Sequence, residues 1–137
     1  MQLFLDTADV KQIGQRFSSG LIAGVTTNPS LIKKSGRGPI DVYRELVVLG
    51  VKDISMEVVG VDSQSLVKQG LKLTDQFGSA STINLPCSTD GLKACKQLTD
   101  QGVRVNMTLV FSVSQSILCA LAGATYVSPF IGRMDDN

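Results

Sequence analysis

Histidine is absent from this sequence of 137 residues, and cysteine is scarce. Without an imidazole, the chain cannot activate a nucleophile through a Ser/His or Cys/His pair, and it lacks the usual nitrogen ligand of metal sites. The three cysteines, Cys87, Cys95 and Cys119, are odd in number and form no C-x-x-C motif. We therefore expect reduced thiols rather than a disulfide framework or a zinc site. Lysine and carboxylate chemistry remain open to this chain.

Long hydrophobic runs and blocks of like charge are also missing. No apolar run reaches the roughly 18 residues of a membrane helix, and the start, MQLFLDTADV, lacks the basic and apolar segments of a leader peptide. The net charge is +1, with acidic and basic residues mixed along the chain. This balance indicates neither a nucleic acid nor a membrane partner, so we expect a cytoplasmic protein. The length fits a single domain, residues 1–137.

The spacing of apolar residues alternates between the period of a strand and that of a helix. It predicts strands near residues 2–6, 21–25, 54–59, 81–85, 103–108 and 125–130. Amphipathic helices are predicted around residues 10–17, 39–49, 66–77, 91–100 and 112–122. A loop rich in Gly, Ser and Lys is predicted between the second strand and Pro39. This alternation implies right-handed crossovers and a parallel sheet.

Two parallel architectures fit this order, an open doubly wound sheet and a barrel. Strands of an open sheet are usually apolar on both faces. Here, one face of the later strands is polar, with Thr82, Asn84, Asn106, Thr108, Tyr126 and Ser128. The other face is apolar, with Ile83, Leu85, Val103, Val105, Met107 and Val127. An apolar side packed on helices and a polar side facing an interior favour a (β/α) barrel of the TIM type.

Polar residues also gather where the predicted strands end. They are Asp6, Thr26, Asn28, Glu57, Asn84, Asn106, Thr108 and Ser128. In a (β/α) barrel, these carboxyl ends form the mouth of the active site. The alternative for each residue is a structural role, such as capping the following helix, and Asp6 is a candidate cap for a helix that begins near Thr7. The recurrence at six strand ends favours a binding site.

Five collinear motifs carry a resemblance to the transaldolase family, and specifically to its short subfamily with the fructose-6-phosphate aldolases. They are LFLDTAD at 3–9, GVTTNPSLI at 24–32, LPCSTDGLKA at 85–94, NMTLVFSVSQ at 106–115 and ALAGATYVSPFIGRMDD at 120–136. The resemblance implies a (β/α) barrel and an enzyme of carbohydrate metabolism in the pentose phosphate pathway. It implies sugar-phosphate substrates of the fructose 6-phosphate, sedoheptulose 7-phosphate and erythrose 4-phosphate class, with no cofactor.

The family mechanism passes a dihydroxyacetone unit between sugar phosphates through a lysine Schiff base. The resemblance implies that Asp6 is the general base, and that Glu57 and Thr108 hold the water that moves protons. It implies substrate contacts from the following residues: Thr26, Asn28, Asn106, Ser128 and Phe130, with Arg133 on the phosphate. Arg133 also lies close in sequence to two aspartates, so an ordinary surface ion pair is its alternative role. Glu57 and Phe130 match the transaldolase pattern, whereas an aldolase-type lyase is expected to carry Gln and Tyr there.

The fourth strand departs from the family pattern, which places the lysine two residues before a proline. Here that position is Asn84, ahead of Pro86. An amide nitrogen is not nucleophilic, so Asn84 cannot form the imine. Lys33 and Lys34 fall in the loop after the second strand and would need a large movement to replace it. We therefore expect little or no transaldolase activity, and the alternative function is a non-catalytic sugar-phosphate-binding or interaction subunit.

The chain supplies five βα units and a sixth strand, whereas a complete barrel has eight units. The first and sixth strands would then be open edges, which associate readily with other strands. We therefore predict a homo-oligomer or a rearranged sheet.

Overall fold

The computed structural model describes residues 1–130. Within this part of the chain, strands and helices alternate as predicted. The strands are β1 (Leu3–Asp6), β2 (Ile22–Thr26), β3 (Ile54–Glu57), β4 (Ser81–Pro86), β5 (Arg104–Val110) and β6 (Tyr126–Pro129). The helices are α1 (Val10–Phe17), α2 (Pro29–Ser35), α3 (Pro39–Val48), α4 (Ser63–Phe77), the short 3-10 helix η1 (Gly78–Ala80), α5 (Thr89–Asp100) and α6 (Val113–Leu121). None of the helices within residues 1–130 is both long and apolar enough to cross a bilayer.

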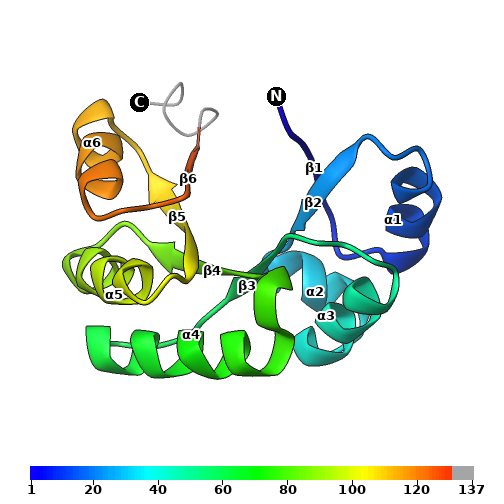
Figure 1. Ribbon diagram of the computed structural model, residues 1–137, viewed down its shortest axis with the longest axis horizontal. Helices are drawn as coiled ribbons and strands as arrows, with labels where there is room; N and C mark the ends of the chain where they lie inside the picture. The colour runs from blue at the N-terminus through cyan, green and yellow to red at the C-terminus, as the bar shows by residue number, and fades with distance from the viewer. Residues whose placement is uncertain (131–137) are drawn as a thin grey trace.

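The six strands form one parallel sheet whose spatial order is the chain order, β1-β2-β3-β4-β5-β6. Figure 1 shows that the sheet curls, with the helices on its outer side and the strands facing inward. An open doubly wound sheet would instead reverse its strand order at a switch point. The fold is therefore an incomplete (β/α) barrel, which confirms the predicted fold class.

Helix starts follow local side-chain chemistry. Five helices begin after a residue whose side-chain oxygen accepts a hydrogen bond from the backbone N–H three positions later: Asp9, Asn28, Asp62, Ser88 and Ser112. The alternative role of Asp6, as the cap of the first helix, is therefore excluded, because Asp9 caps α1. At the start of α6, the Ser112 hydroxyl accepts from the Gln115 N–H, and the Gln115 side chain in turn accepts from the N–H of Phe111.

The segment that we predicted as a loop after the second strand contains the helix α2. Asn28 caps it, Pro29 stands in its first turn, and Gly36 ends it with a φ of 71°, in the left-handed region. Only Ile32 of this helix is buried. With one apolar contact point there is no periodic stripe to read, so the spacing rule missed the helix.

The two faces of the later strands separate as predicted. Ile83, Leu85 and Met107 are fully buried on the apolar side, where β4 and β5 meet the helices α4 and α5. Gly70 of α4 permits a close approach, because a Cβ atom there would lie 3.0 Å from Cδ1 of Leu98. The polar inner face is also mostly closed to solvent: Thr82, Asn84 and Asn106 are all buried.

Candidate functional site

The parallel register brings the predicted polar residues of neighbouring strands side by side at the carboxyl ends. Asp6 pairs with Thr26 between β1 and β2, and Glu57 pairs with Asn84 between β3 and β4. Asn84 in turn is level with Asn106 on β5. Residues that are far apart in sequence therefore line one rim of the half-barrel.

Asp6 and Thr26 form the first pair. The Thr26 hydroxyl donates to a carboxylate oxygen of Asp6 over 2.9 Å, and Asp6 is exposed. Asn28 lies two residues beyond Thr26, but its side-chain oxygen accepts the Leu31 N–H at 2.9 Å as the cap of α2. Asp6 thus has a solvent-accessible carboxylate held by a hydroxyl, while the oxygen of Asn28 is committed to the helix.

Glu57 and Asn84 form the second pair, on adjacent strands. The Asn84 amide donates to Oε2 of Glu57 over 3.5 Å, and the backbone N–H of Glu57 donates to the Tyr43 hydroxyl over 3.1 Å. Burial raises the pKa of the Glu57 carboxyl, and the hydrogen bond from Asn84 offsets part of that increase. A carboxyl with a raised pKa can hold or pass a proton near neutral pH, which suits acid–base chemistry.

The Asn84 side chain is only partly satisfied. The residue is 4% exposed, and its Oδ1 atom has no hydrogen-bond partner among residues 1–130. A buried amide oxygen without a donor costs about 1–3 kcal/mol. Such groups are rare in folded proteins and often mark positions that await a ligand or a water.

Asn106 and Ser128 form the third pair. The Ser128 hydroxyl donates to Oδ1 of Asn106 over 2.8 Å, while the Asn106 amide donates to the Ser55 hydroxyl over 3.5 Å. Thr108, two residues along β5, donates its hydroxyl to the Leu85 carbonyl over 3.3 Å. The inner rim from β3 to β6 is thus linked by hydrogen bonds between side chains of different strands.

Phe130 follows β6 and stacks on Phe111, with ring centroids 5.7 Å apart and an angle of 19° between the ring planes. It is 40% exposed. Arg133, expected at the phosphate, lies outside the described residues.

A second polar cluster, which the sequence reasoning missed, surrounds Asp53 at the opposite ends of the strands. Its carboxylate accepts from the Thr82 hydroxyl at 2.6 Å and from the Tyr126 hydroxyl at 2.7 Å, and Arg104 lies 3.8 Å away. Burial, followed by the neighbouring Asp53, raises the pKa of Tyr126. Asp53 shares the period-two face of Ser55 and Glu57, so extending that face by one step would have found it.

A cavity of about 380 Å³ opens beside Glu57, between α2, α3 and the end of β3. Its lining includes Tyr43 and, from α2, Ile32 and Lys33. The expectation that Lys33 lies in a loop is therefore wrong, because it is on the helix α2 and lines the same cavity as Glu57.

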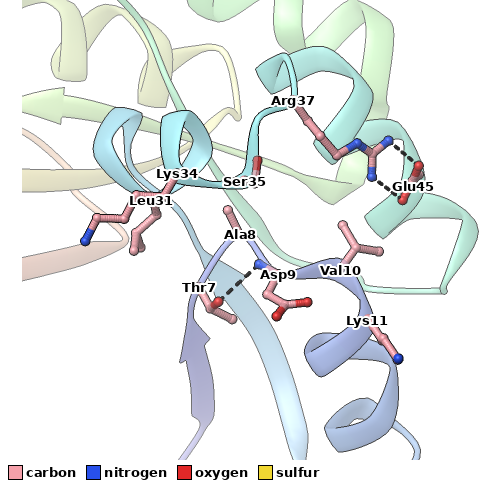
Figure 2. Close-up of a pocket in the computed structure, with 10 residues that line it drawn as sticks. All are labelled: Thr7, Ala8, Asp9, Val10, Lys11, Leu31, Lys34, Ser35, Arg37 and Glu45. Atoms are coloured by element: carbon pink, nitrogen blue, oxygen red, sulfur yellow. Dashed lines mark hydrogen bonds and ion pairs between the residues drawn. The ribbon is translucent and has the colours of Figure 1, made fainter.

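A separate groove of about 690 Å³ runs between the β1–α1 connection and α2. Figure 2 shows Arg37 turned toward Glu45 at one end of it, where the guanidinium holds the carboxylate through both oxygens. This ion pair lowers the pKa of Glu45. Arg37 is thus engaged with Glu45, and the other basic side chains that line the groove are Lys11 and Lys34.

Metal chemistry has little support within residues 1–130, where no group of three potential acidic or thiol ligands comes together. The arrangement can instead bind hydroxyl and carbonyl groups through amides and hydroxyls, with one exposed and one partly buried carboxylate available for proton transfer.

Comparison with known proteins places this geometry in a family. The model of the family described as "Transaldolase/Fructose-6-phosphate aldolase" matches residues 3–137. Relatives named "Probable transaldolase" from Anaeromyxobacter sp. (strain K) and Ruegeria sp. (strain TM1040) are 50% and 48% identical over 136 residues. These alignments cover 99% of this chain and 62% of each relative, so the chain spans less than two thirds of their length.

One solved structure supports the fold alone. The crystal structure of "a putative phosphonomutase from Burkholderia cenocepacia J2315" superposes with a TM-score of 0.65 at 12% identity, covering 93% of this chain and 68% of that one. The sequence similarity, by contrast, extends over nearly the whole chain. This chain belongs to the transaldolase/fructose-6-phosphate aldolase family.

Proposed function

We propose that this chain binds sugar phosphates at the mouth of its half-barrel in the manner of a transaldolase, and that it does not form the covalent imine of that reaction. The observation that carries the proposal is the pair of the partly buried Glu57 and the buried Asn84. An amide stands beside the acid–base carboxyl, where the family pattern has an amine.

The proposed reaction class explains why one residue matters so much. In the transaldolase mechanism, the lysine amine adds to the ketose carbonyl, water leaves, and the protonated imine accepts electrons as a carbon–carbon bond breaks. Asn84 has no basic lone pair on nitrogen and cannot take the first step. Loss of a nucleophile lowers an enzymatic rate by up to about a millionfold. Binding by the remaining residues does not require the amine.

The other rim residues take the family roles within the proposal. Asp6 is the base for the substrate hydroxyl, and its exposed carboxylate suits that role. Glu57 and Thr108 hold the water that shuttles protons. Hydroxyls of the three-carbon unit contact the amides of Asn28 and Asn106.

The remaining contacts come from the end of the chain and from the second strand. Thr26 supports Asp6 through the bond between them. Ser128 and Phe130 line the pocket, and Arg133 binds the phosphate. Glu57 and Phe130 match the transferase pattern rather than that of an aldolase-type lyase, so fructose 6-phosphate and an aldose phosphate are the ligands to test.

Borohydride trapping separates binding from imine formation. Three proteins are compared: the wild type, Asn84→Lys and the matched control Asn84→Gln. Each is incubated with fructose 6-phosphate and reduced with borohydride, and its mass is measured by mass spectrometry. Calorimetry measures the binding of fructose 6-phosphate in parallel. We expect binding without an adduct in the wild type and in the Asn84→Gln variant, and an adduct in the Asn84→Lys variant. Absence of binding in all three proteins would refute the proposal.

Lys33 is the amine most able to overturn the non-covalent part of the proposal, since it lines the cavity beside Glu57. If the wild type forms an adduct that the Lys33→Ala variant loses, Lys33 supplies the nucleophile and the chain is catalytic. Lys34, its neighbour on α2, lines the other groove, so Lys34→Ala is the matched control.

Self-association belongs to the same proposal. The sheet has β1 and β6 at its two edges. Next to β6, helix α6 exposes Val113, Ile117 and Leu121, which recur every four residues along one side. An exposed apolar helix stripe of this kind favours contact with another chain. Sedimentation should therefore detect a homo-oligomer, and a compact, stable monomer would contradict it.

A further inference from the structure

Two cysteines that are distant in sequence lie in contact beside the mouth. Cys87 is the first residue after β4 and is partly buried, whereas Cys119 on α6 is fully buried. The Cys119 thiol donates to the Cys87 sulfur, and the two Sγ atoms are 3.6 Å apart. The proposed function uses neither thiol.

We propose that Cys87 and Cys119 form an oxidation site, at which a hydroperoxide converts the two thiols into a disulfide. The sulfur atoms must approach from 3.6 Å to the roughly 2.05 Å of a disulfide bond. The backbone positions both residues for this approach. The Cys87 N–H donates to the Thr108 carbonyl of β5 over 2.8 Å, and α6 follows directly from β5 in the chain.

The difference in exposure sets the order of the two steps. Cys87 is the more accessible sulfur, so its thiolate attacks a peroxide oxygen. The O–O bond breaks, Cys87 becomes a sulfenic acid, and the leaving oxygen departs with the thiol proton as the alcohol, or as water when the oxidant is hydrogen peroxide. Burial, reinforced by the bond to Cys87, raises the pKa of Cys119 to about 12, so Cys119 is not the thiol that reacts first with the peroxide.

In the second step the Cys119 sulfur attacks the Cys87 sulfur. The S–S bond forms, the S–O bond breaks, and the hydroxyl leaves as water with the Cys119 proton. In sum, two thiols lose two electrons and two protons, and one hydroperoxide is reduced to water and the corresponding alcohol, or to two waters when it is hydrogen peroxide.

Cys95 provides an internal comparison. It is fully buried on α5, and its thiol donates to the Ala122 carbonyl over 3.6 Å. Burial raises the pKa of Cys95 to about 11. With its proton held by a carbonyl and no exposed surface, Cys95 should remain a thiol under conditions that oxidise the pair.

The disulfide would join α6 to Cys87 in the connection between β4 and α5. Cys87 lies three residues after Asn84, and Ser88 caps α5. The crosslink would therefore tie the connection that follows the Asn84 strand to the outer helix layer. The proposal is independent of whether sugar phosphates bind.

Tryptic mapping tests the site cleanly, because the three cysteines fall in three different peptides, residues 73–93, 94–96 and 105–133. The full chain, Cys87→Ala, Cys119→Ala and the control Cys95→Ala are treated with hydrogen peroxide and alkylated. In the wild type, we expect the number of free thiols to decrease from three to one and the mass to decrease by about 2 Da. Peptides 73–93 and 105–133 should be joined by a disulfide, and dithiothreitol should separate them. Cys95→Ala should form the same joined pair.

Three results would overturn the proposal. In the first, Cys87 is oxidised to sulfinic acid and no disulfide joins it to peptide 105–133. In the second, the disulfide includes Cys95. In the third, Cys87 forms a disulfide only between two chains, and none forms within one chain. Because Cys119→Ala changes a buried side chain, circular dichroism is used to check that this variant folds. The partly buried Cys87→Ala variant carries the test independently if Cys119→Ala does not fold.

Discussion

Replacing Asn84 with leucine should stabilise this protein, although Asn84 is buried in the inner face of the barrel. The substitution keeps the branched shape of the side chain and removes the Oδ1 atom that lacks a partner within residues 1–130. Removing that desolvated oxygen recovers about 1–3 kcal/mol. The bond that is lost, from the Asn84 amide to Glu57, is at the long limit of 3.5 Å and contributes about 0.5 kcal/mol. The net gain is about 0.5–2.5 kcal/mol.

Urea denaturation measures this difference, and circular dichroism is the suitable signal because the sequence has no tryptophan. A residue whose removal stabilises the fold is one that is retained for binding or catalysis, so the same experiment tests the proposed site. The variant should also lose affinity for fructose 6-phosphate.

Asn106→Leu is the matched control. Asn106 is also 4% exposed and is level with Asn84 on the neighbouring strand. Its oxygen accepts from Ser128 at 2.8 Å, so its removal should cost about 1–3 kcal/mol. If Asn84→Leu destabilises the protein as much as Asn106→Leu does, the Asn84 oxygen is satisfied in solution and the reasoning fails.

Three further substitutions test the fold around the site. Asp53→Ala leaves the buried Thr82 hydroxyl and the partly buried Tyr126 hydroxyl without the carboxylate to which they now donate, and it should cost about 2–4 kcal/mol in urea denaturation. A cost below about 1 kcal/mol would mean that water replaces the carboxylate. Gly91→Ala places a Cβ atom 1.8 Å from the Pro86 carbonyl oxygen and should lower the melting temperature markedly, whereas the control Gly14→Ala meets its nearest neighbour at 3.8 Å and should not. Glu57→Gln removes a carboxyl whose raised pKa makes the folded state bind its proton more tightly than the unfolded chain does. The free energy of unfolding of the wild type, relative to that of the variant, should therefore decrease as pH rises from the ordinary glutamate pKa of 4.5 through the raised pKa of Glu57. A difference between the two proteins that is constant with pH would contradict this.

The alternation of strands and helices could be predicted from the sequence because each element has its own repeat of apolar residues. The same repeats identified the polar inner face that holds Asn84 and Asn106 and the apolar outer face that holds Ile83 and Leu85. The helix α2 was missed because a single buried residue, Ile32, leaves no repeat to detect. Local rules therefore worked where an element buries a whole stripe.

The sequence by itself determined which residues reach the carboxyl ends of the strands, since that depends only on element type and on the parity of positions along each strand. Tertiary structure alone decided which of them touch. The Glu57–Asn84 contact, the cluster around Asp53 and the approach of Cys87 to Cys119 all depend on strand register and on how the helices pack against the sheet. Those quantities are set by many long-range contacts acting together, so no local spacing encodes them.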